Sequence, residues 1–170
     1  GVVIINPNNP TGYLYSQAEL EALGKMIKKH NLYLYSDEVY RRYCYDGLKH
    51  FSVMNLKGIE ENTILFDSMS KRYSECGIRV GAIISRNKEI LNTSLKFGMA
   101  RLCPPALGQI AAEASLETSD EYFHNVYEEY IRRRDFMVKA LNKMPGVVCP
   151  TPQGAFYSIV KLPVDDSEKF

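Results

Sequence analysis

The stretch GVVIINPNNPTGYLYSQAELEALGKMIKKHNLYLYS, residues 1–36, decides the fold class. It opens with a short, continuous apolar run and ends with another, LYLYS at 32–36, and such runs are typical of strands buried on both faces. The segment between them starts at a capping box, Ser16 and Glu19, and repeats apolar residues at helical spacing. Strand, helix and strand in this order predict a βαβ unit within a parallel sheet.

Two further apolar runs extend the predicted sheet. They are NTILFDS at 62–68 and RVGAIIS at 79–85. The connection between them is short, whereas a parallel pair needs a crossover of a dozen or more residues, so we expect this pair to be antiparallel. The sequence therefore predicts an α/β fold with a mainly parallel sheet.

The second half of the chain changes to helical patterns. A pair of prolines separates two predicted helices, 87–102 and 104–119, and a long amphipathic helix is expected at 120–143. The segment 147–162 then returns to a strand pattern with turn punctuation, and residues 165–167 resemble the start of another helix. Because the pattern begins and stops within regular elements, we expect both ends to lie inside a larger fold.

Composition limits the classes of function. With 170 residues, 45% hydrophobic and 24% charged, the chain is typical of a globular domain. The net charge of +1 gives no electrostatic footprint for nucleic acid or an anionic membrane, and no apolar run is long enough to span a bilayer. Four widely spaced cysteines and the lack of a leader pattern favour free thiols in the cytoplasm. Three scattered histidines form no metal-ligand pattern, so we expect no metal site.

Polar side chains follow three of the predicted strands. Asn9 follows the first strand, Asp37 and Tyr40 follow the second, and Lys71 follows the third, with Arg79 eight positions later. In an open α/β sheet, ligands bind outside the carboxyl ends of the strands. We therefore expect these side chains to face a single cleft.

The chemical groups in this set match one cofactor. A lysine amine can bond covalently to an aldehyde, and an arginine with the hydroxyls of Ser68 and Ser70 suits a phosphate. The carboxylate of Asp37 would pair with a protonated pyridine nitrogen, and Tyr40 and Asn9 could donate to a phenolic oxygen. Aldehyde, phosphate, pyridinium and phenolate together describe pyridoxal phosphate, an electron sink for reactions of amino acids.

Three motifs, NPNNPTG, SDEVY and SMSKRYSECGIRVG, carry a family resemblance in that order. The sequence resembles the class I and II aminotransferases of the aspartate aminotransferase type, which are fold type I pyridoxal-phosphate enzymes. The resemblance implies that Lys71 carries the internal aldimine and shuttles a proton, with Asp37 and Tyr40 as the other catalytic residues. It implies the following cofactor-binding set: Asn9, Asp37, Tyr40, Ser68, Ser70, Lys71 and Arg79. Glu75 departs from the family pattern, which has an apolar residue there. The departure affects the expected packing of the loop between Lys71 and Arg79 and not the expected cofactor ligands.

The resemblance also implies an architecture. Residues 1–145 would belong to the three-layer large domain and residues 146–170 to the start of the small domain. The expected reaction moves an amino group from an amino acid, with aspartate as the expected donor, to a 2-oxo acid in a homodimer. Family segments that hold the phosphate, stack on the cofactor and grip the substrate carboxylate lie outside these residues, so we expect this chain alone to bind cofactor weakly and not to transaminate. Arg101 could contact a substrate acid, contact the dimer partner or lie on the surface.

Three alternatives stay open at this point. The pair Tyr45 and Lys49 has the spacing of short-chain dehydrogenases, but YDG predicts a turn where that pair needs a helix, and no glycine-rich dinucleotide motif is present. A catalytically silent chain that only binds cofactor or dimerises has the same motifs. A lyase or decarboxylase of the same fold would also use the same cofactor site.

Overall fold

The computed structural model describes residues 1–170 and has four strands in a single sheet. The strand order is β1-β2-β3-β4, where β1 to β3 run parallel and β4 pairs antiparallel to β3. The α/β class, the mainly parallel sheet and the antiparallel last pair are therefore confirmed. The strands are β1 Val2–Ile5, β2 Leu34–Asp37, β3 Thr63–Ser68 and β4 Gly81–Ser85.

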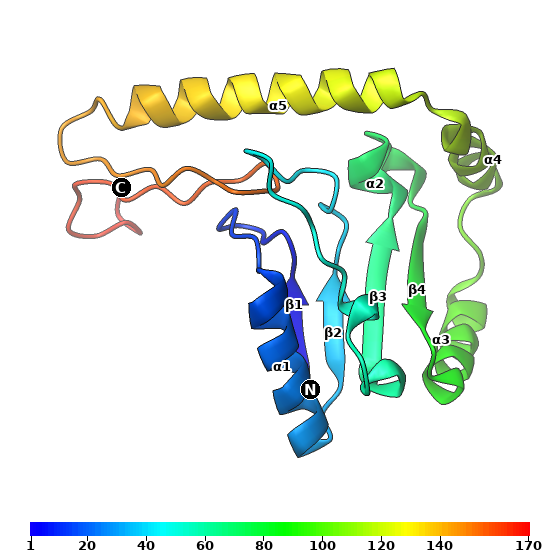
Figure 1. Ribbon diagram of the computed structural model, residues 1–170. Helices are drawn as coiled ribbons and strands as arrows, with labels where there is room; N and C mark the ends of the chain where they lie inside the picture. Colours follow the sequence, from blue (N-terminus) through cyan, green and yellow to red (C-terminus); the bar gives the residue numbers. More distant parts are fainter.

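Helices connect and flank the strands (Figure 1). The α-helices are α1 Gln17–His30, α2 Met69–Arg72, α3 Lys88–Arg101, α4 Ala106–Ala114 and α5 Asp120–Leu141. Short 3-10 turns lie at Val53–Asn55, Glu60–Asn62, Cys76–Ile78 and Ser115–Glu117. No helix combines the length and the apolar character needed to cross a membrane.

Helix α1 forms for the reasons expected from the sequence. Ser16 Oγ accepts from the Glu19 backbone N at 3.3 Å, and the Glu19 carboxylate accepts from the Ser16 backbone N at 2.8 Å, which completes the capping box. Its apolar stripe packs on the sheet, where Leu20 and Ile27 are fully buried. Asn31 ends the helix in the left-handed conformation with φ of 46°.

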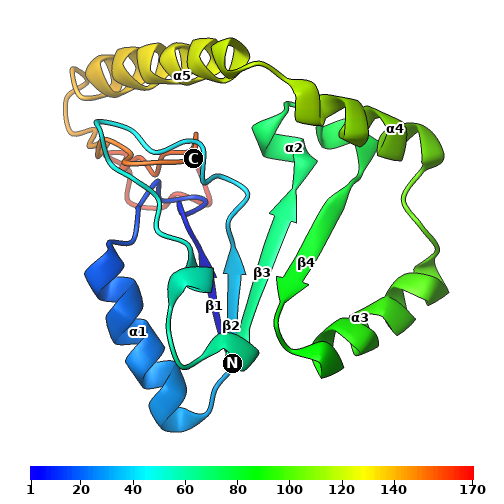
Figure 2. The ribbon, with the colours of Figure 1, turned by 45° about the vertical axis from the view of Figure 1, so that its right-hand side comes forward.

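The main core lies on one face of the sheet, between α1 and the segment that leads to β3. Its buried members are Ile4, Leu20, Ile27, Leu34, Val53, Leu56 and Ile59. The carboxyl ends of β1, β2 and β3 all point toward the side of the sheet on which α5 lies (Figures 1 and 2). The three parallel strands therefore end on the same side of the molecule as this long helix.

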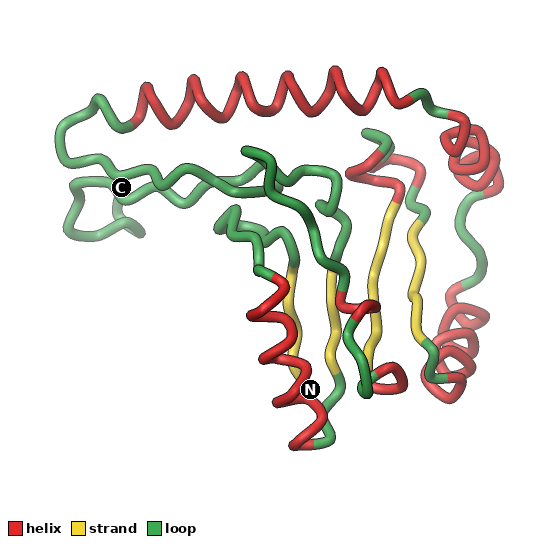
Figure 3. The backbone as a smooth tube through the Cα atoms, viewed as in Figure 1, coloured by secondary structure: helices red, strands yellow, loops and turns green.

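The segment after α5 differs from the prediction. Residues 147–162 form no strand, and only two isolated bridges occur, Cys44 with Gly154 and Val148 with Lys161. Pro150 and Pro152 lack the backbone N–H that a ladder needs, so the apolar run cannot pair continuously. Figure 3 shows this segment as loop running back beneath α5. The domain boundary at 145/146 stays a prediction.

The expected helix start at 165–167 is also wrong. Residues 167–169 form a turn, in which the Asp166 carboxylate accepts from the Glu168 backbone N at 3.0 Å. A helix gains its repeating hydrogen bonds only after its first turn is fixed, and a single capped turn does not offset that cost. Lys71 lies in the four-residue helix α2, directly after β3.

Arg134 joins α5 to two loops far from it in sequence. Its guanidinium makes two hydrogen bonds to the Asp46 carboxylate, at 2.8 and 2.9 Å, and one to Asp135 at 2.8 Å. The same group donates to the Pro152 carbonyl at 3.3 Å and lies 4.9 Å from the centre of the Tyr45 ring. With 8% of its side chain exposed, Arg134 is the buried anchor of α5.

We expect Arg134→Ala to lower the free energy of unfolding by about 2 kcal/mol, since hydrogen bonds to charged groups and packing on Tyr45 are lost together. Arg133→Ala is the matched control, because Arg133 pairs with Glu129 on the surface with 65% of its side chain exposed. Urea unfolding of both variants measures the difference. Equal, small losses in the two variants would contradict the anchoring role.

Candidate active site

The predicted site residues lie at the carboxyl ends of the parallel strands. Asn9 belongs to the turn after β1, Asp37 is the last residue of β2, and Ser68 is the last residue of β3. Register pairs Asp37 with Ile5 on one side and Phe66 on the other, so β2 is the central strand of this group. The site is therefore built on neighbouring strand ends, as α/β sheets dictate.

Tyr40 is the centre of the hydrogen bonding. It is 4% exposed, its hydroxyl accepts from Asn9 Nδ2 at 3.4 Å, and it lies 2.9 Å from the Tyr157 hydroxyl. Burial raises the pKa of the Tyr40 phenol above its ordinary value of 10, and the Tyr157 hydroxyl adds to that rise. Tyr40 therefore keeps its proton at neutral pH and can donate it to an acceptor in the site.

Lys71 presents its amine to aromatic rings. Lys71 Nζ lies 5.9 Å from the ring centres of both Tyr40 and Phe156. The Tyr43 hydroxyl donates to the Lys71 carbonyl at 2.7 Å, which fixes the backbone of α2 beside the aromatic cluster. The amine is half-buried and has no carboxylate partner among the ion pairs of the structure. The amine therefore lies beside the predicted site and takes part in no ion pair.

The two serines are brought together at the start of α2, and Arg79 is not. Ser68 Oγ lies 2.8 Å from Ser70 Oγ and also donates to the Val80 carbonyl at 3.1 Å. Arg79 has φ of 59°, and its exposed guanidinium donates back to the Cys76 carbonyl at 2.7 Å. No hydrogen bond joins Arg79 to either serine, although their backbones are neighbours through Val80.

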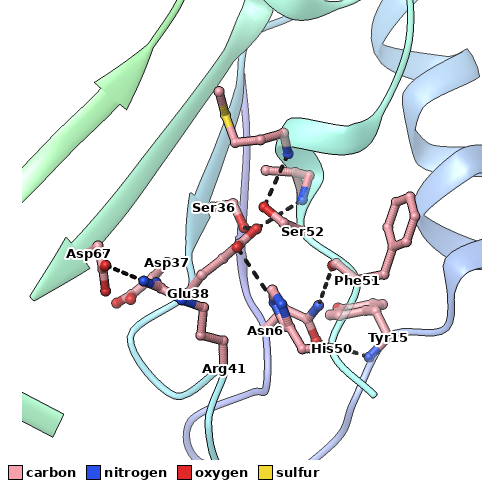
Figure 4. Close-up of polar contacts among 12 residues, drawn as sticks. Asn6, Tyr15, Ser36, Asp37, Glu38, Arg41, His50, Phe51, Ser52 and Asp67 are labelled. Atoms are coloured by element: carbon pink, nitrogen blue, oxygen red, sulfur yellow. Dashed lines mark hydrogen bonds and ion pairs between the residues drawn. The ribbon is translucent and has the colours of Figure 1, made fainter. Parts of the chain in front are cut away.

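Asp37 keeps its carboxylate free of cations. One oxygen accepts from the Val39 backbone N at 3.1 Å, so Asp37 caps a turn rather than a helix. The neighbouring carboxylate, Asp67, is neutralised by Arg41 and Arg72, as Figure 4 shows for Arg41. Two arginines therefore pair with Asp67, and the half-buried Asp37 has no protein cation.

A buried pair that the sequence reasoning missed lies on the core side of Asp37 (Figure 4). Glu38 is 1% exposed, and its carboxyl group accepts from Val53 N at 2.9 Å and from Ser36 Oγ at 3.3 Å. Its other oxygen lies 3.6 Å from His50 Nε2, and neither atom has another partner. The signal available was the DE pair after an apolar strand, since successive residues of a strand face opposite sides.

Burial sets the charge state of this pair. It raises the pKa of the Glu38 carboxyl group, and burial followed by the charge of Arg41 lowers the pKa of His50 to about 4. Both shifts favour the uncharged forms of the two groups. The pair holds the turn after β2 against the loop at 50–53.

We expect Glu38→Gln to stabilise the protein increasingly as pH rises. The folded pKa of Glu38 lies above its ordinary value of 4.5, so its contribution is complete below pH 4.5 and is lost as pH rises through the folded pKa. In that window the native protein loses about 1.4 kcal/mol per pH unit, whereas glutamine keeps the hydrogen bonds without titrating.

Urea unfolding of both proteins at pH 5 and pH 8 measures this difference. His50 opposes the trend, because its lowered pKa removes stability as pH falls from 6.5 to about 4, but it contributes to both proteins and largely cancels. A constant difference between the two proteins across this range would contradict the raised pKa of Glu38.

Aromatic residues from the segment after α5 complete the site. Phe156 packs edge-on against Tyr40 at 5.2 Å and stacks on Tyr130 at 5.0 Å between ring centres. Tyr157 contacts Tyr40 with ring centres 5.5 Å apart. The sequence reasoning missed both because it interpreted 147–162 only as a strand. The available signal was GAFY, an aromatic pair directly after turn residues.

Other residues singled out from the sequence lie outside this cluster. Glu75 accepts from Ser115 Oγ at 2.7 Å, so its loop is tied to the end of α4. Arg101 is exposed at the end of α3 and has no ion pair. Asp46 and Gly47 form a turn, so Tyr45 and Lys49 share no helix face, as the dehydrogenase alternative would require.

The donor set fits pyridoxal phosphate. An amine without an ion pair, a carboxylate without a protein cation, a protonated phenol with an amide donor, and two hydroxyls lie around the same strand ends. These groups match the aldehyde, the pyridine nitrogen, the phenolic oxygen and the phosphate. The fit rests on the chemistry of the side chains and on the free states of Lys71 and Asp37.

Comparison with known proteins identifies the family. The model of the family "Aminotransferase class I and II" matches residues 1–170. The chain therefore belongs to the class I and II aminotransferases, whose members depend on pyridoxal phosphate.

Named relatives agree with this family. The chain is 36% identical over 164 residues to an aspartate aminotransferase of Pyrococcus abyssi, covering 95% of this chain and 42% of the relative. It is 35% identical to aromatic-amino-acid aminotransferase 2 of Thermococcus litoralis, with the same coverage. The crystal structure of aspartate aminotransferase from Thermotoga maritima has a TM-score of 0.85 and 34% identity, covering 98% of this chain and 43% of that chain. The chain thus spans about two fifths of the length of these relatives.

Proposed function

We propose that this chain is the cofactor-binding core of a pyridoxal-phosphate-dependent aminotransferase that moves an amino group from an amino acid to a 2-oxo acid. The observation that carries the proposal is the placement of Lys71. Its unpaired amine faces Tyr40, and the Tyr40 hydroxyl accepts from Asn9 Nδ2 at 3.4 Å. An amine 5.9 Å from the ring centre of a proton-donating phenol suits the adjacent aldehyde and phenolic oxygen of one cofactor.

Lys71 has two roles in this proposal. Its Nζ would hold the cofactor through the aldehyde group, and as a free amine it would take the proton from the substrate α-carbon as a general base. The cofactor supplies an electron sink for the charge left at that carbon. The Tyr43 hydroxyl donates to the Lys71 carbonyl at 2.7 Å, and this bond holds the Lys71 backbone beside the rings of Tyr40 and Phe156.

The remaining residues hold and polarise the cofactor. The Asp37 carboxylate pairs with the protonated pyridine nitrogen, which keeps the ring electron-poor. Tyr40 donates to the phenolic oxygen, and Asn9 supports it. Ser68 and Ser70, whose hydroxyls lie together, would donate to the phosphate. Arg79, which donates to the Cys76 carbonyl in the structure, would give up that bond to join them. The Phe156 ring lies beside the Lys71 amine.

The substrate and the assembly are part of the proposal. Relatives named for aspartate and for aromatic amino acids have nearly equal identity to this chain, at 36% and 35%. Aspartate is the donor that we propose first, in a homodimer. Four free cysteines, two of them exposed, support a reducing cytoplasm as the site of action.

A coupled assay of the full-length protein tests the proposal. Aspartate and 2-oxoglutarate are supplied with pyridoxal phosphate, and we expect oxaloacetate and glutamate in equal amounts. Aromatic donors are measured in parallel to set the donor preference. Loss of carbon dioxide or ammonia without a new amino acid would instead indicate a lyase or decarboxylase, and cofactor binding without any product would indicate a silent chain.

A further inference from the structure

We propose that Tyr157 is a positioning residue, whose hydroxyl directs the proton of Tyr40 toward the phenolic oxygen of the cofactor. This inference rests on the proposed function and adds a residue from the segment after α5 to the site. Tyr157 acts through Tyr40 and is separated from it by 117 positions in the chain.

The placement of Tyr157 is fixed by its backbone neighbours. The Ala155 N–H donates to the Tyr43 carbonyl at 2.9 Å, and the Tyr45 hydroxyl donates to the Ala155 carbonyl. A side chain at Gly154 would lie 2.6 Å from Pro7 and 2.7 Å from the Tyr43 carbonyl, so only glycine permits this close approach. The segment 154–157 is therefore pinned to the loop that carries Tyr40.

The two phenol rings also lock each other in orientation. The Tyr40 and Tyr157 rings are perpendicular, at 89°, with centres 5.5 Å apart, and their oxygens lie 2.9 Å apart. Edge-to-face contacts of this kind are favourable and specific in geometry. Tyr157 is half-buried, and its hydroxyl has no other hydrogen-bond partner in the structure.

Counting protons decides what the Tyr157 hydroxyl does. A phenol has one proton to donate and two lone pairs that accept. Asn9 Nδ2 can only donate, so it occupies one lone pair of Tyr40. When Tyr40 gives its proton to the cofactor oxygen, the contact with Tyr157 persists only if Tyr157 donates to the second lone pair. With Asn9 and Tyr157 both donating to the Tyr40 oxygen, the Tyr40 proton can point only toward the cofactor. Each of the two donors also polarises the Tyr40 O–H bond.

A double-mutant cycle tests this inference in the full-length holoenzyme. The variants are Tyr157→Phe, Tyr40→Phe and the double variant, with Tyr130→Phe as control. Tyr130 belongs to the same aromatic cluster, but its hydroxyl makes no hydrogen bond. The readout is the pH midpoint of the visible absorption of the bound cofactor, together with kcat/KM.

We expect Tyr157→Phe to shift the pH midpoint in the same direction as Tyr40→Phe, by about 0.4 to 1 pH unit, and Tyr130→Phe to leave it unchanged. In the Tyr40→Phe background, Tyr157→Phe should add no shift, because the partner that transmits its effect is gone. The value of kcat/KM should follow the same pattern.

The other outcomes overturn the inference in distinguishable ways. An equal shift in both backgrounds would mean that Tyr157 acts by general packing and not through Tyr40. No shift for Tyr157→Phe beside a clear shift for Tyr40→Phe would overturn the inference alone and leave the proposed function in place. No shift for Tyr40→Phe would remove the proposed contact of Tyr40 with the cofactor, and the inference with it.

Discussion

Lys71→Ala should abolish turnover, lowering kcat by at least about 10⁴-fold in the full-length enzyme. One amine serves both as the covalent attachment point and as the base at the substrate α-carbon, so no other residue replaces it. Cofactor should still bind, more weakly, through Asp37 and the serine pair. Lys71→Arg should be equally inactive, because a guanidinium keeps the charge but does not lose its proton. Steady-state rates and cofactor titration measure both effects.

Lys49→Ala is the control for this prediction. Lys49 is exposed next to the turn at Asp46 and Gly47, and its side chain makes no hydrogen bond or ion pair in the structure. Its loss should leave kcat unchanged. Substantial residual transamination in Lys71→Ala, or a comparable loss in Lys49→Ala, would show that the wrong lysine has been assigned.

Asp37→Asn is the second variant with a large expected effect. Asparagine keeps the size of the side chain and the hydrogen bond to the Val39 N–H, but it removes the negative charge. Breaking a buried, charged pair costs about 3–5 kcal/mol, so kcat/KM should fall by about 10² to 4 × 10³-fold. The effect should appear in kcat as well as in KM, since the charge polarises the ring during the reaction.

The neighbouring carboxyl group provides a matched control. Glu38→Gln changes the adjacent residue in the same chemical way, yet Glu38 lies in the core, where burial raises the pKa of its carboxyl group. We expect it to alter kcat/KM by less than about threefold, in the range of surface-like substitutions. Equal losses in Asp37→Asn and Glu38→Gln would mean that the charge of Asp37 has no specific role.

Local patterns made most of the fold predictable. The capping box at Ser16 and the apolar runs of the four strands are short-range signals, and the short link before β4 indicated its antiparallel pairing. The segment 147–162 failed because its strand-like composition is opposed by prolines that remove ladder donors. Its pairing depends on long-range contacts such as Cys44 with Gly154, which no local pattern encodes.

The part of the candidate site that lies at the carboxyl ends of the strands was predictable from the sequence, and the rest was not. Asn9, Asp37 and Ser68 follow strands, so the sheet itself brings them together. Tyr157 and Phe156 reach Tyr40 only because the chain returns beneath α5, and the Glu38–His50 pair forms by burial across two loops. Arg79 was expected to face the same cleft, but its guanidinium donates to the Cys76 carbonyl.

The most direct test of the central claim is the location of the covalent attachment. The holoenzyme is treated with sodium borohydride, which makes the bond between an amine and the cofactor aldehyde carbon permanent, and the digested peptides are analysed by mass spectrometry. We expect the added mass on Lys71, in one copy per chain, and none on Lys49. A label on another lysine, or scattered over exposed lysines without preference for Lys71, would contradict the assignment of this residue and the site built around it.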